Sequence, residues 1–420
     1  SDMFRSASAL IVVLLVASVL GNSTPQSIKI SLTEDQASMQ VTWYTDSEGS
    51  SPVVQFDSKG FDPSSLSASL IQAKTVEFTE KLWSGYTNYA TISQLSANTV
   101  YYYAVGDQKT GVWSELFNFT TGAMSADVVP FNFVTYGDMG EGVDNSTVHN
   151  VINRLDSLQM VLHVGDIAYA DLQSGNEGKY GNQTTWNMFL EEITPIATRI
   201  PYMVCPGNHD IFDGVSSNYQ NSFMMPQGSS GGNWYSFDYN GVHFVGISSE
   251  TDYSSTSPQI AWLESELKSF RKANPTGWLI AFSHRPYYCS SDFGWCKDDQ
   301  SRYALQKTVE PLFYQYNVDL FIAGHSHEYE RFLPAYQNEV AGTYEDPKGP
   351  VSIVIGTAGC QEGLNPSFQE PAPSISSGVR LLTTGFGQVS VINSTHIQWQ
   401  FIKDNTNEIL DDIYFTKGTF

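Results

Sequence analysis

The sequence is short of basic residues. Its 420 residues include 21 Lys and Arg against 44 Asp and Glu, which gives a formal net charge of −23 at pH 7. A nucleic-acid-binding domain relies on a basic patch, and this composition argues against one and against any polyanionic partner. A small anionic substrate remains compatible with such a chain if metal ions reverse the sign of the local field.

The sequence also lacks an apolar run long enough to span a membrane. Its most apolar run, from Ala9 to Leu20, falls short of the roughly 20 residues that a spanning helix needs. Met3 and Arg5 precede this run and small or polar residues follow it, which is typical of a secretory signal peptide. We therefore expect residues 1–21 to be a signal peptide, with no stable membrane insertion after its cleavage; an uncleaved anchor is the alternative.

Sequons for N-linked glycosylation agree with a chain that leaves the cytosol. The pattern Asn-X-Ser/Thr favours a surface position in a secreted protein. The sequons are at Asn22, Asn118, Asn145, Asn182 and Asn393. We expect a secreted protein, extracellular or vacuolar–lysosomal, that is glycosylated at the last four of these.

Cysteine is scarce, with four in the chain and no CxxC pair. This spacing argues against a zinc site built from cysteines. In a secreted chain an even number of cysteines favours disulfides. Cys289 and Cys296 bracket a short loop, and we expect them to pair. Cys205 and Cys360 both end strand-like runs and are then left either to pair with each other or to remain buried free thiols.

The pattern of apolar residues changes once along the chain. Residues 25–122 consist of short alternating or β-branched segments separated by turns, which favours a sandwich like a fibronectin type III domain. A linker follows, and from residue 130 strand-like segments alternate with helical ones, which is typical of an α/β fold. We expect an all-β N-terminal domain, an α/β domain over residues 130–400 with helices flanking its sheets, and a C-terminal strand or tail over residues 401–420.

Polar side chains with metal-binding chemistry follow five apolar strand-like segments of the second domain. In α/β sheets, ligands bind beyond the carboxyl ends of the strands, so these side chains can converge. Carboxylates, imidazoles and an amide oxygen together suit divalent or trivalent ions, and one carboxylate can bridge two of them. Each residue alone is more often a turn, cap or core residue, but the ordered set predicts a metal centre: Asp138, Asp166, Tyr169, Asn208, His284, His325 and His327.

These blocks, GDxG, GDxxY, GNH, a histidine after a strand, and GHxH, resemble in this order the signature of the purple acid phosphatases. That family belongs to the calcineurin-like metallophosphoesterases. The resemblance extends over nearly the whole chain and is closest to the long, two-domain form, with residues 130–400 as the metallophosphoesterase domain. The tyrosine is the most specific element, because the wider superfamily does not require it.

The resemblance implies two metal ions. Fe(III) would be held by Asp138, Tyr169, His327 and the bridging Asp166. A divalent Fe, Zn or Mn would be held by Asp166 together with Asn208, His284 and His325. His325 and His327, one residue apart in "GHSHEYER", would thus serve different metals.

The substrate side departs from the plant members of this family. Those carry histidines in the loop after the fourth block, whereas residues 285–299 here contain none, as in the animal and protist long forms resembling acid phosphatase type 7. The resemblance makes His209 a catalytic residue that contacts the phosphate. We expect Arg285 and Tyr287 to take over substrate contacts from the missing histidines.

The function expected from these features is acid phosphatase activity on small phosphorylated substrates. A hydroxide activated by the two metals would hydrolyse phosphate monoesters without a phosphoenzyme. Two alternatives stay open at this point: a metal-dependent phosphodiesterase or nucleotide pyrophosphatase, and a non-catalytic extracellular binding protein that uses the N-terminal domain.

Overall fold

The computed structural model describes residues 24–80, 83–142, 144–172, 182–211, 217–226, 230–345 and 347–418. The expected signal peptide and Asn22 lie outside these ranges. None of the helices in the described ranges combines the length and the apolarity that crossing a bilayer requires.

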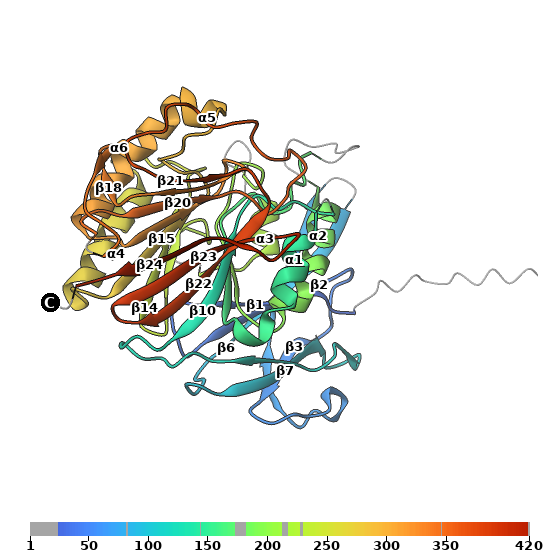
Figure 1. Ribbon diagram of the computed structural model, residues 1–420. Helices are drawn as coiled ribbons and strands as arrows, with labels where there is room; N and C mark the ends of the chain where they lie inside the picture. Colours follow the sequence, from blue (N-terminus) through green and yellow to red (C-terminus); the bar gives the residue numbers. More distant parts are fainter. Residues whose placement is uncertain are drawn as a thin grey trace, which may run out of the picture.

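The N-terminal part is all-β, as expected, and consists of two antiparallel sheets (Figure 1). One has the order β1-β2-β6-β5, with β1 Gln26–Leu32, β2 Met39–Thr45, β6 Trp83–Ile92 and β5 Lys74–Glu80. The other has the order β4-β3-β7-β8, with β9 on β7: β4 Ser69–Gln72, β3 Pro52–Asp57, β7 Val100–Asp107, β8 Val112–Trp113 and β9 Phe117–Thr120. A short 3-10 turn, Pro63–Ser65, precedes β4.

The rest of the chain forms two larger sheets. The six-stranded sheet has the order β12-β11-β10-β22-β23-β24: β12 Tyr202–Val204, β11 Met160–His163, β10 Phe131–Tyr136, β22 Gly385–Asn393, β23 His396–Lys403 and β24 Ile409–Thr416. The seven-stranded sheet has the order β13-β14-β15-β16-β20-β17-β21: β13 Tyr235–Tyr239, β14 Val242–Gly246, β15 Trp278–Ser283, β16 Leu320–Ala323, β20 Val351–Ile355, β17 Tyr329–Phe332 and β21 Ser376–Leu381. A small hairpin pairs β18 Ala335–Tyr336 with β19 Glu339–Val340.

Helices cover the outer faces of these sheets. Figure 1 shows α1, α2 and α3 on one side of the molecule and α4 and α6 on the other, with the strands between them. Their bounds are α1 Ser146–Ile152, α2 Gln183–Ala197, α3 Ser217–Ser222, α4 Pro258–Ala273, α5 Gly294–Lys297 and α6 Gln300–Gln315, with a 3-10 turn at Leu155–Ser157. The α/β class expected for this part is therefore confirmed.

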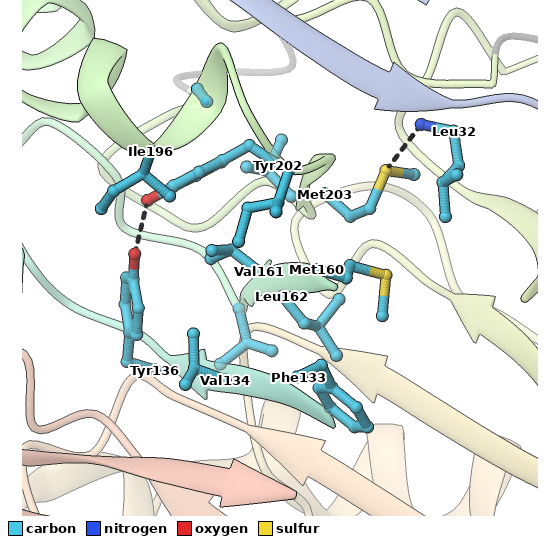
Figure 2. Close-up of a cluster of buried hydrophobic side chains, with 14 of the residues drawn as sticks. Leu32, Phe133, Val134, Tyr136, Met160, Val161, Leu162, Ile196, Tyr202 and Met203 are labelled. Carbon is cyan, nitrogen blue, oxygen red and sulfur yellow. Dashed lines mark hydrogen bonds between the residues drawn. The ribbon is translucent and has the colours of Figure 1, made fainter. Parts of the chain in front are cut away.

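The central strands are apolar along their whole length because both of their faces are buried. β10, β11 and β12 run parallel, as do β14, β15, β16 and β20. The rings of Phe133 on β10 and Phe244 on β14 meet edge to face at 5.6 Å and join the two sheets. Figure 2 shows how side chains of β10, β11 and β12 pack together, with the hydroxyls of Tyr136 and Tyr202 3.0 Å apart.

The N-terminal domain and the six-stranded sheet share one hydrophobic core. Its buried members include Ile28 and Trp43 from the first domain and Val161 from the second. The amide of Leu32 donates to Sδ of Met203 at 3.3 Å, as Figure 2 shows, and the Tyr103 hydroxyl donates to the carbonyl of Thr198 at 2.9 Å. The packing therefore continues across the junction.

The structure shows which cysteines are paired and which are free. Cys289 and Cys296 form the expected disulfide, with their Cα atoms 5.3 Å apart. Cys205 and Cys360 are free and buried, so the pairing considered for them is not formed.

The sequons of the described ranges lie in different settings. Asn118, Asn145 and Asn393 are exposed. Asn182 is partly buried and caps α2, because its side-chain oxygen accepts a hydrogen bond from the amide of Thr184 at 2.9 Å.

Candidate metal centre

All seven expected ligands lie in loops near the carboxyl ends of parallel strands. Asp138 follows β10, Asp166 and Tyr169 follow β11, and Asn208 follows β12, all from the six-stranded sheet. His284 follows β15 and the pair His325 and His327 follows β16, both from the seven-stranded sheet. The structure thus brings the seven side chains together where the ends of the two sheets meet.

The backbone at four of these positions adopts a conformation that residues other than glycine rarely take. Asp138, Asp166, Tyr169 and His325 have φ of 61°, 50°, 48° and 65°. Positive φ at such residues costs free energy and persists where the surrounding structure enforces it, most often at functional sites. Four of the seven expected ligands therefore lie in strained loop positions.

Two glycines of the motifs are required by close approach. A Cβ on Gly207 would lie 2.1 Å from Oδ1 of Asp166, and a Cβ on Gly324 would lie 2.4 Å from Oδ2 of Asp138. No side chain can be added at these distances. The GNH and GHxH motifs therefore need glycine so that the two carboxylates can lie close to the backbone.

The first half of the centre groups Asp138, Tyr169 and His327. The Tyr169 hydroxyl lies 3.0 Å from Nε2 of His327 and 3.3 Å from Oδ1 of Asp138. Nε2 of His327 lies 3.2 Å from the same Asp138 oxygen. All three side chains are buried, with exposures of 0%, 0% and 7%.

The second half groups Asp166 with His284, His325 and Asn208. Potential ligand atoms of Asp166, His284 and His325 lie within 4.8 Å of one another. Nε2 of His284 is 3.0 Å from Oδ2 of Asp166 and 3.2 Å from Oδ1 of Asn208. Oδ2 of Asp166 also lies 3.4 Å from the Tyr169 hydroxyl, so one carboxylate borders both halves.

Hydrogen bonds at the far side of two imidazoles prepare them as ligands. Nδ1 of His284 lies 3.0 Å from the carbonyl of Val164, and Nδ1 of His327 lies 2.7 Å from the carbonyl of Gly363. A carbonyl can only accept, so each Nδ1 carries a proton and Nε2 is the nitrogen that faces the centre and could bind a metal ion. Buried carboxylate oxygens and imidazole nitrogens face one another, an arrangement that a cation between them would stabilise.

In the chain without ions burial lowers the pKa of His284, but the nearby carboxylates outweigh it and raise this pKa, as hydrogen bonds to Asp138 and Cys360 do for His327. These two imidazoles would therefore release protons on binding metal. Burial raises the pKa of the Asp166 carboxyl, but His284 and His209 outweigh it and the net pKa is lowered. Burial lowers the pKa of His325 well below its usual range, and Arg285 lowers it further. Asp166 is therefore ionised and His325 neutral, which are the forms that bind metal ions.

His209 lies beside the centre and not within it. Its ring stacks on that of Tyr169, with centroids 4.2 Å apart, and its amide donates to Oδ1 of Asp166 at 2.8 Å. Nδ1 lies 2.7 Å from Oδ2 of Asp171. Burial lowers the pKa of His209, but the nearby carboxylates of Asp166, Asp171 and Glu362 raise it to about 10.

The two residues expected to replace the missing loop histidines have different surroundings. Arg285 lies at the centre: Nη1 is 3.2 Å from Nε2 of His325, and Nε and Nη2 bind the Glu250 carboxylate at 2.6 and 3.0 Å. Tyr287 has no exposed surface, and its ring stacks on Phe321 at 4.7 Å. This burial speaks against a substrate contact for Tyr287 and makes it a core residue.

Two residues that lie against the centre were not predicted from the sequence. Asp210 accepts hydrogen bonds from the amides of Ile167 at 3.1 Å and Gly207 at 2.8 Å, and so joins two ligand loops. Burial raises the pKa of its carboxyl to about 8. Asp210 directly follows the GNH motif, and this position is the feature of the sequence that could have identified it. Glu362 lies 3.7 Å from Nε2 of His209, but it comes from a distant loop and nothing in its local sequence marks it.

Three family models match successive parts of the chain. The N-terminal domain of purple acid phosphatases matches residues 25–121, the calcineurin-like phosphoesterase model matches residues 131–329, and the C-terminal model of iron/zinc purple acid phosphatase-like proteins matches residues 349–412.

Relatives match over nearly the whole chain. Acid phosphatase type 7 of Homo sapiens is 34% identical, covering 95% of this chain and 92% of its own, and that of Mus musculus is 32% identical, covering 94% and 91%. Purple acid phosphatase 18 of Arabidopsis thaliana is 32% identical and covers 92% of this chain and 83% of its own. The structure of a purple acid phosphatase from yellow lupin seeds has the same fold, with a TM-score of 0.81 at 23% identity over 94% of this chain and 75% of its own. The chain therefore belongs to the purple acid phosphatase family of calcineurin-like phosphoesterases.

Proposed function

We propose that this protein is a metal-dependent acid phosphatase that hydrolyses small phosphate monoesters. The observation that carries the proposal is the convergence of the seven side chains around Asp166, whose Oδ2 lies 3.0 Å from Nε2 of His284 and 3.4 Å from the Tyr169 hydroxyl. The matches to acid and purple acid phosphatases support the same activity.

The proposed metals are Fe(III) and a divalent Fe, Zn or Mn. Asp138, Tyr169 and His327 supply the half with the one phenol oxygen, which suits Fe(III). Asn208, His284 and His325 supply the other half, with Asp166 between the two. When bound, the two ions would act as Lewis acids that hold phosphate oxygens and lower the pKa of water.

The protein's own groups then orient the reactants. His209, held by Asp171 and by stacking on Tyr169, directs Nε2 toward the space beside Asp166, where it donates a hydrogen bond to a phosphate oxygen. Nε of Arg285 binds Glu250 at 2.6 Å, and its Nη1 lies next to Nε2 of His325, so the guanidinium stands beside the second half of the centre. The burial of these groups lowers the cost of reorganisation when the phosphate binds.

The proposed location is secreted, extracellular or vacuolar–lysosomal. The apolar run at residues 9–20 and the exposed sequons at Asn118, Asn145 and Asn393 support it. An acidic compartment would also match an acid phosphatase.

The test is a joint measurement of metal content, visible spectrum and activity on the purified protein. We expect about two metals per chain, at least one of them iron, with turnover of a phosphomonoester well above that of a diester at acidic pH. Asp166→Asn should abolish turnover while the far-UV circular dichroism is retained. Faster turnover of the diester would favour a phosphodiesterase, and a folded protein that takes up no metal even after reconstitution would favour a binding protein.

A further inference from the structure

A groove with a volume of about 400 Å³ lies between the N-terminal domain and the rest of the chain. The N-terminal domain lines it with β9 and the turn before β7, and the linker, the loops before β11 and β12 and the end of β13 line it from the other side. This volume is in the range of roughly 300–1,000 Å³ that sites for small ligands occupy. None of the seven expected metal ligands lines the groove, so it is a separate feature of the molecule.

Asn118 on β9 belongs to the lining of this groove. Successive side chains of a strand point to opposite faces. Phe119 is 1% exposed and packs in the core, whereas Asn118 and Thr120 on either side of it are exposed and both line the groove. These three residues form the sequon Asn-Phe-Thr. A sugar attached to Nδ2 of Asn118 would therefore begin inside the groove.

The groove carries little net charge, although the chain as a whole is strongly acidic. Asp156 and Arg199 are the charged residues of its lining, and they pair with each other at 2.9 Å. Their charges cancel, so the groove has no field that would attract an anion or a cation. A neutral polar molecule therefore suits this groove better than the phosphorylated substrate proposed for the metal centre.

The lining combines hydrogen-bond donors with apolar surface, as the recognition of a sugar requires. Oε1 of Gln159 accepts a hydrogen bond from the amide of Asn132 at 2.8 Å, which fixes the side-chain amide and leaves its NH₂ group as a donor. Arg199 uses one nitrogen in its ion pair and its side chain is 47% exposed, so it keeps further N–H donors. Pro130 and Pro201 add apolar surface, against which the C–H groups of a pyranose ring can pack.

We propose that the N-linked glycan of Asn118 docks in this groove and bridges the two domains. Its first N-acetylhexosamine units are neutral and combine hydroxyl and acetamide groups with an apolar ring face, which matches the chemistry of the lining. The glycan is tethered to one wall, so its effective concentration is high and a few contacts with Gln159 and Arg199 on the other wall suffice to hold it. The inference requires passage through the secretory pathway and is independent of the phosphatase activity.

The stability test removes this glycan in two ways from the protein secreted by a eukaryotic host. Asn118→Gln and Thr120→Ala both destroy the sequon, and each should lower the unfolding temperature by about 2–4 °C, as expected for the loss of a few hydrogen bonds. Asn145→Gln is the matched control, because Asn145 is an exposed sequon outside the groove whose side chain makes no cap hydrogen bond. In protein made without N-glycosylation all these differences should vanish. Their persistence there, or a loss in only one of the two variants, would overturn the bridge.

Enzymatic release of the glycan from the folded protein tests the docking directly. Peptide N-glycosidase should release the docked glycan of Asn118 about tenfold more slowly than that of Asn145, and equally fast after denaturation. Gln159→Ala with Arg199→Ala should remove most of this protection, whereas Lys307→Ala, an exposed position on α6 outside the groove, should not. Equal release at both sites of the folded wild type, or an Asn118 that glycopeptide mass spectrometry finds unmodified, would overturn the proposal whether or not the protein is a phosphatase.

Discussion

The hydroxyl of Tyr169 lies 3.0 Å from Nε2 of His327, although 158 positions separate the two residues in the chain. The tyrosine comes from the six-stranded sheet and the histidine from the seven-stranded one, so this contact joins the two halves of the fold at the metal centre. It also places a phenol oxygen among groups that bind hard cations.

We predict that Tyr169→Phe removes the visible absorption of the metal-loaded protein. A tyrosine phenolate bound to Fe(III) would absorb visible light by charge transfer, and the remaining six expected ligands should still hold close to two metals. Visible spectroscopy and metal analysis on the same sample provide the measurement. Tyr136→Phe, another buried tyrosine whose hydroxyl lies 3.0 Å from that of Tyr202, is the control and should keep the band. A band that survives in Tyr169→Phe would contradict the assignment.

Asp171 should matter for turnover because of its effect on His209. Without the carboxylate 2.7 Å from Nδ1, the imidazole loses both its orientation and part of its positive charge. We expect Asp171→Asn to lower kcat about tenfold and His209→Gln about a hundredfold. The double variant should resemble His209→Gln, since the two residues act as a unit.

The control for this pair is Asp156→Asn, which breaks an exposed ion pair with Arg199 at 2.9 Å and should leave kcat unchanged. Strictly additive losses in the double variant would mean that Asp171 acts on the reaction independently of His209.

The disulfide should make a measurable contribution to stability. Removing it by Cys289→Ser with Cys296→Ser opens a short loop, and the chain-entropy model assigns about 2–3 kcal/mol to such a closure. Denaturant unfolding of the wild type with reductant should show the same loss. Reductant should have no effect on the double variant, because the other two cysteines are free; a further loss there would contradict the assignment of these thiols.

His243 should make stability depend on pH. Nδ1 lies 2.7 Å from Asp238 on β13, and Nε2 lies 3.2 Å from Glu266 on α4, while the ring stacks on Phe270 at 4.4 Å. Burial lowers the pKa of this imidazole, but the two carboxylates outweigh it and the net pKa is raised. The folded protein therefore holds a proton that the unfolded chain releases above about pH 6.5.

The resulting stabilisation is complete below about pH 6.5 and is lost as the pH rises through the folded pKa, with a slope of at most about 1.4 kcal/mol per pH unit. His243→Gln should flatten this part of the curve of unfolding free energy against pH, whereas the exposed His396 can be changed to Gln without such an effect. Identical slopes for the wild type and His243→Gln would refute the prediction.

The sequence predicts the two fold classes, and the convergence of seven polar side chains at the strand ends, for a physical reason. Parallel strands that are buried on both faces appear in the sequence as continuous apolar runs. Ligand-binding residues lie in the loops just after the carboxyl ends of these strands. It does not predict which strands share a sheet: β22, β23 and β24 complete the sheet that begins with β10, and β24, expected only as a strand or tail, is its edge.

Some missed features carried a local signal and others did not. The hairpin of β13 and β14 turns at Asn240 and Gly241, with φ of 49° and 80°, and an Asn-Gly pair between alternating residues predicts such a turn. The burial of Tyr287 and the approach of Glu362 to His209 depend on the packing of distant loops, which no local pattern encodes.

The core that crosses the domain junction limits which fragments of this protein can be expressed in soluble form. A fragment that starts at the linker would expose the surfaces of Met203 and Thr198 that Leu32 and Tyr103 now cover. Such a catalytic fragment would present apolar surface to water and would tend to aggregate. The N-terminal domain is thus not a detachable module, and gene fusions or deletions that separate it from the phosphoesterase sheets should yield insoluble protein.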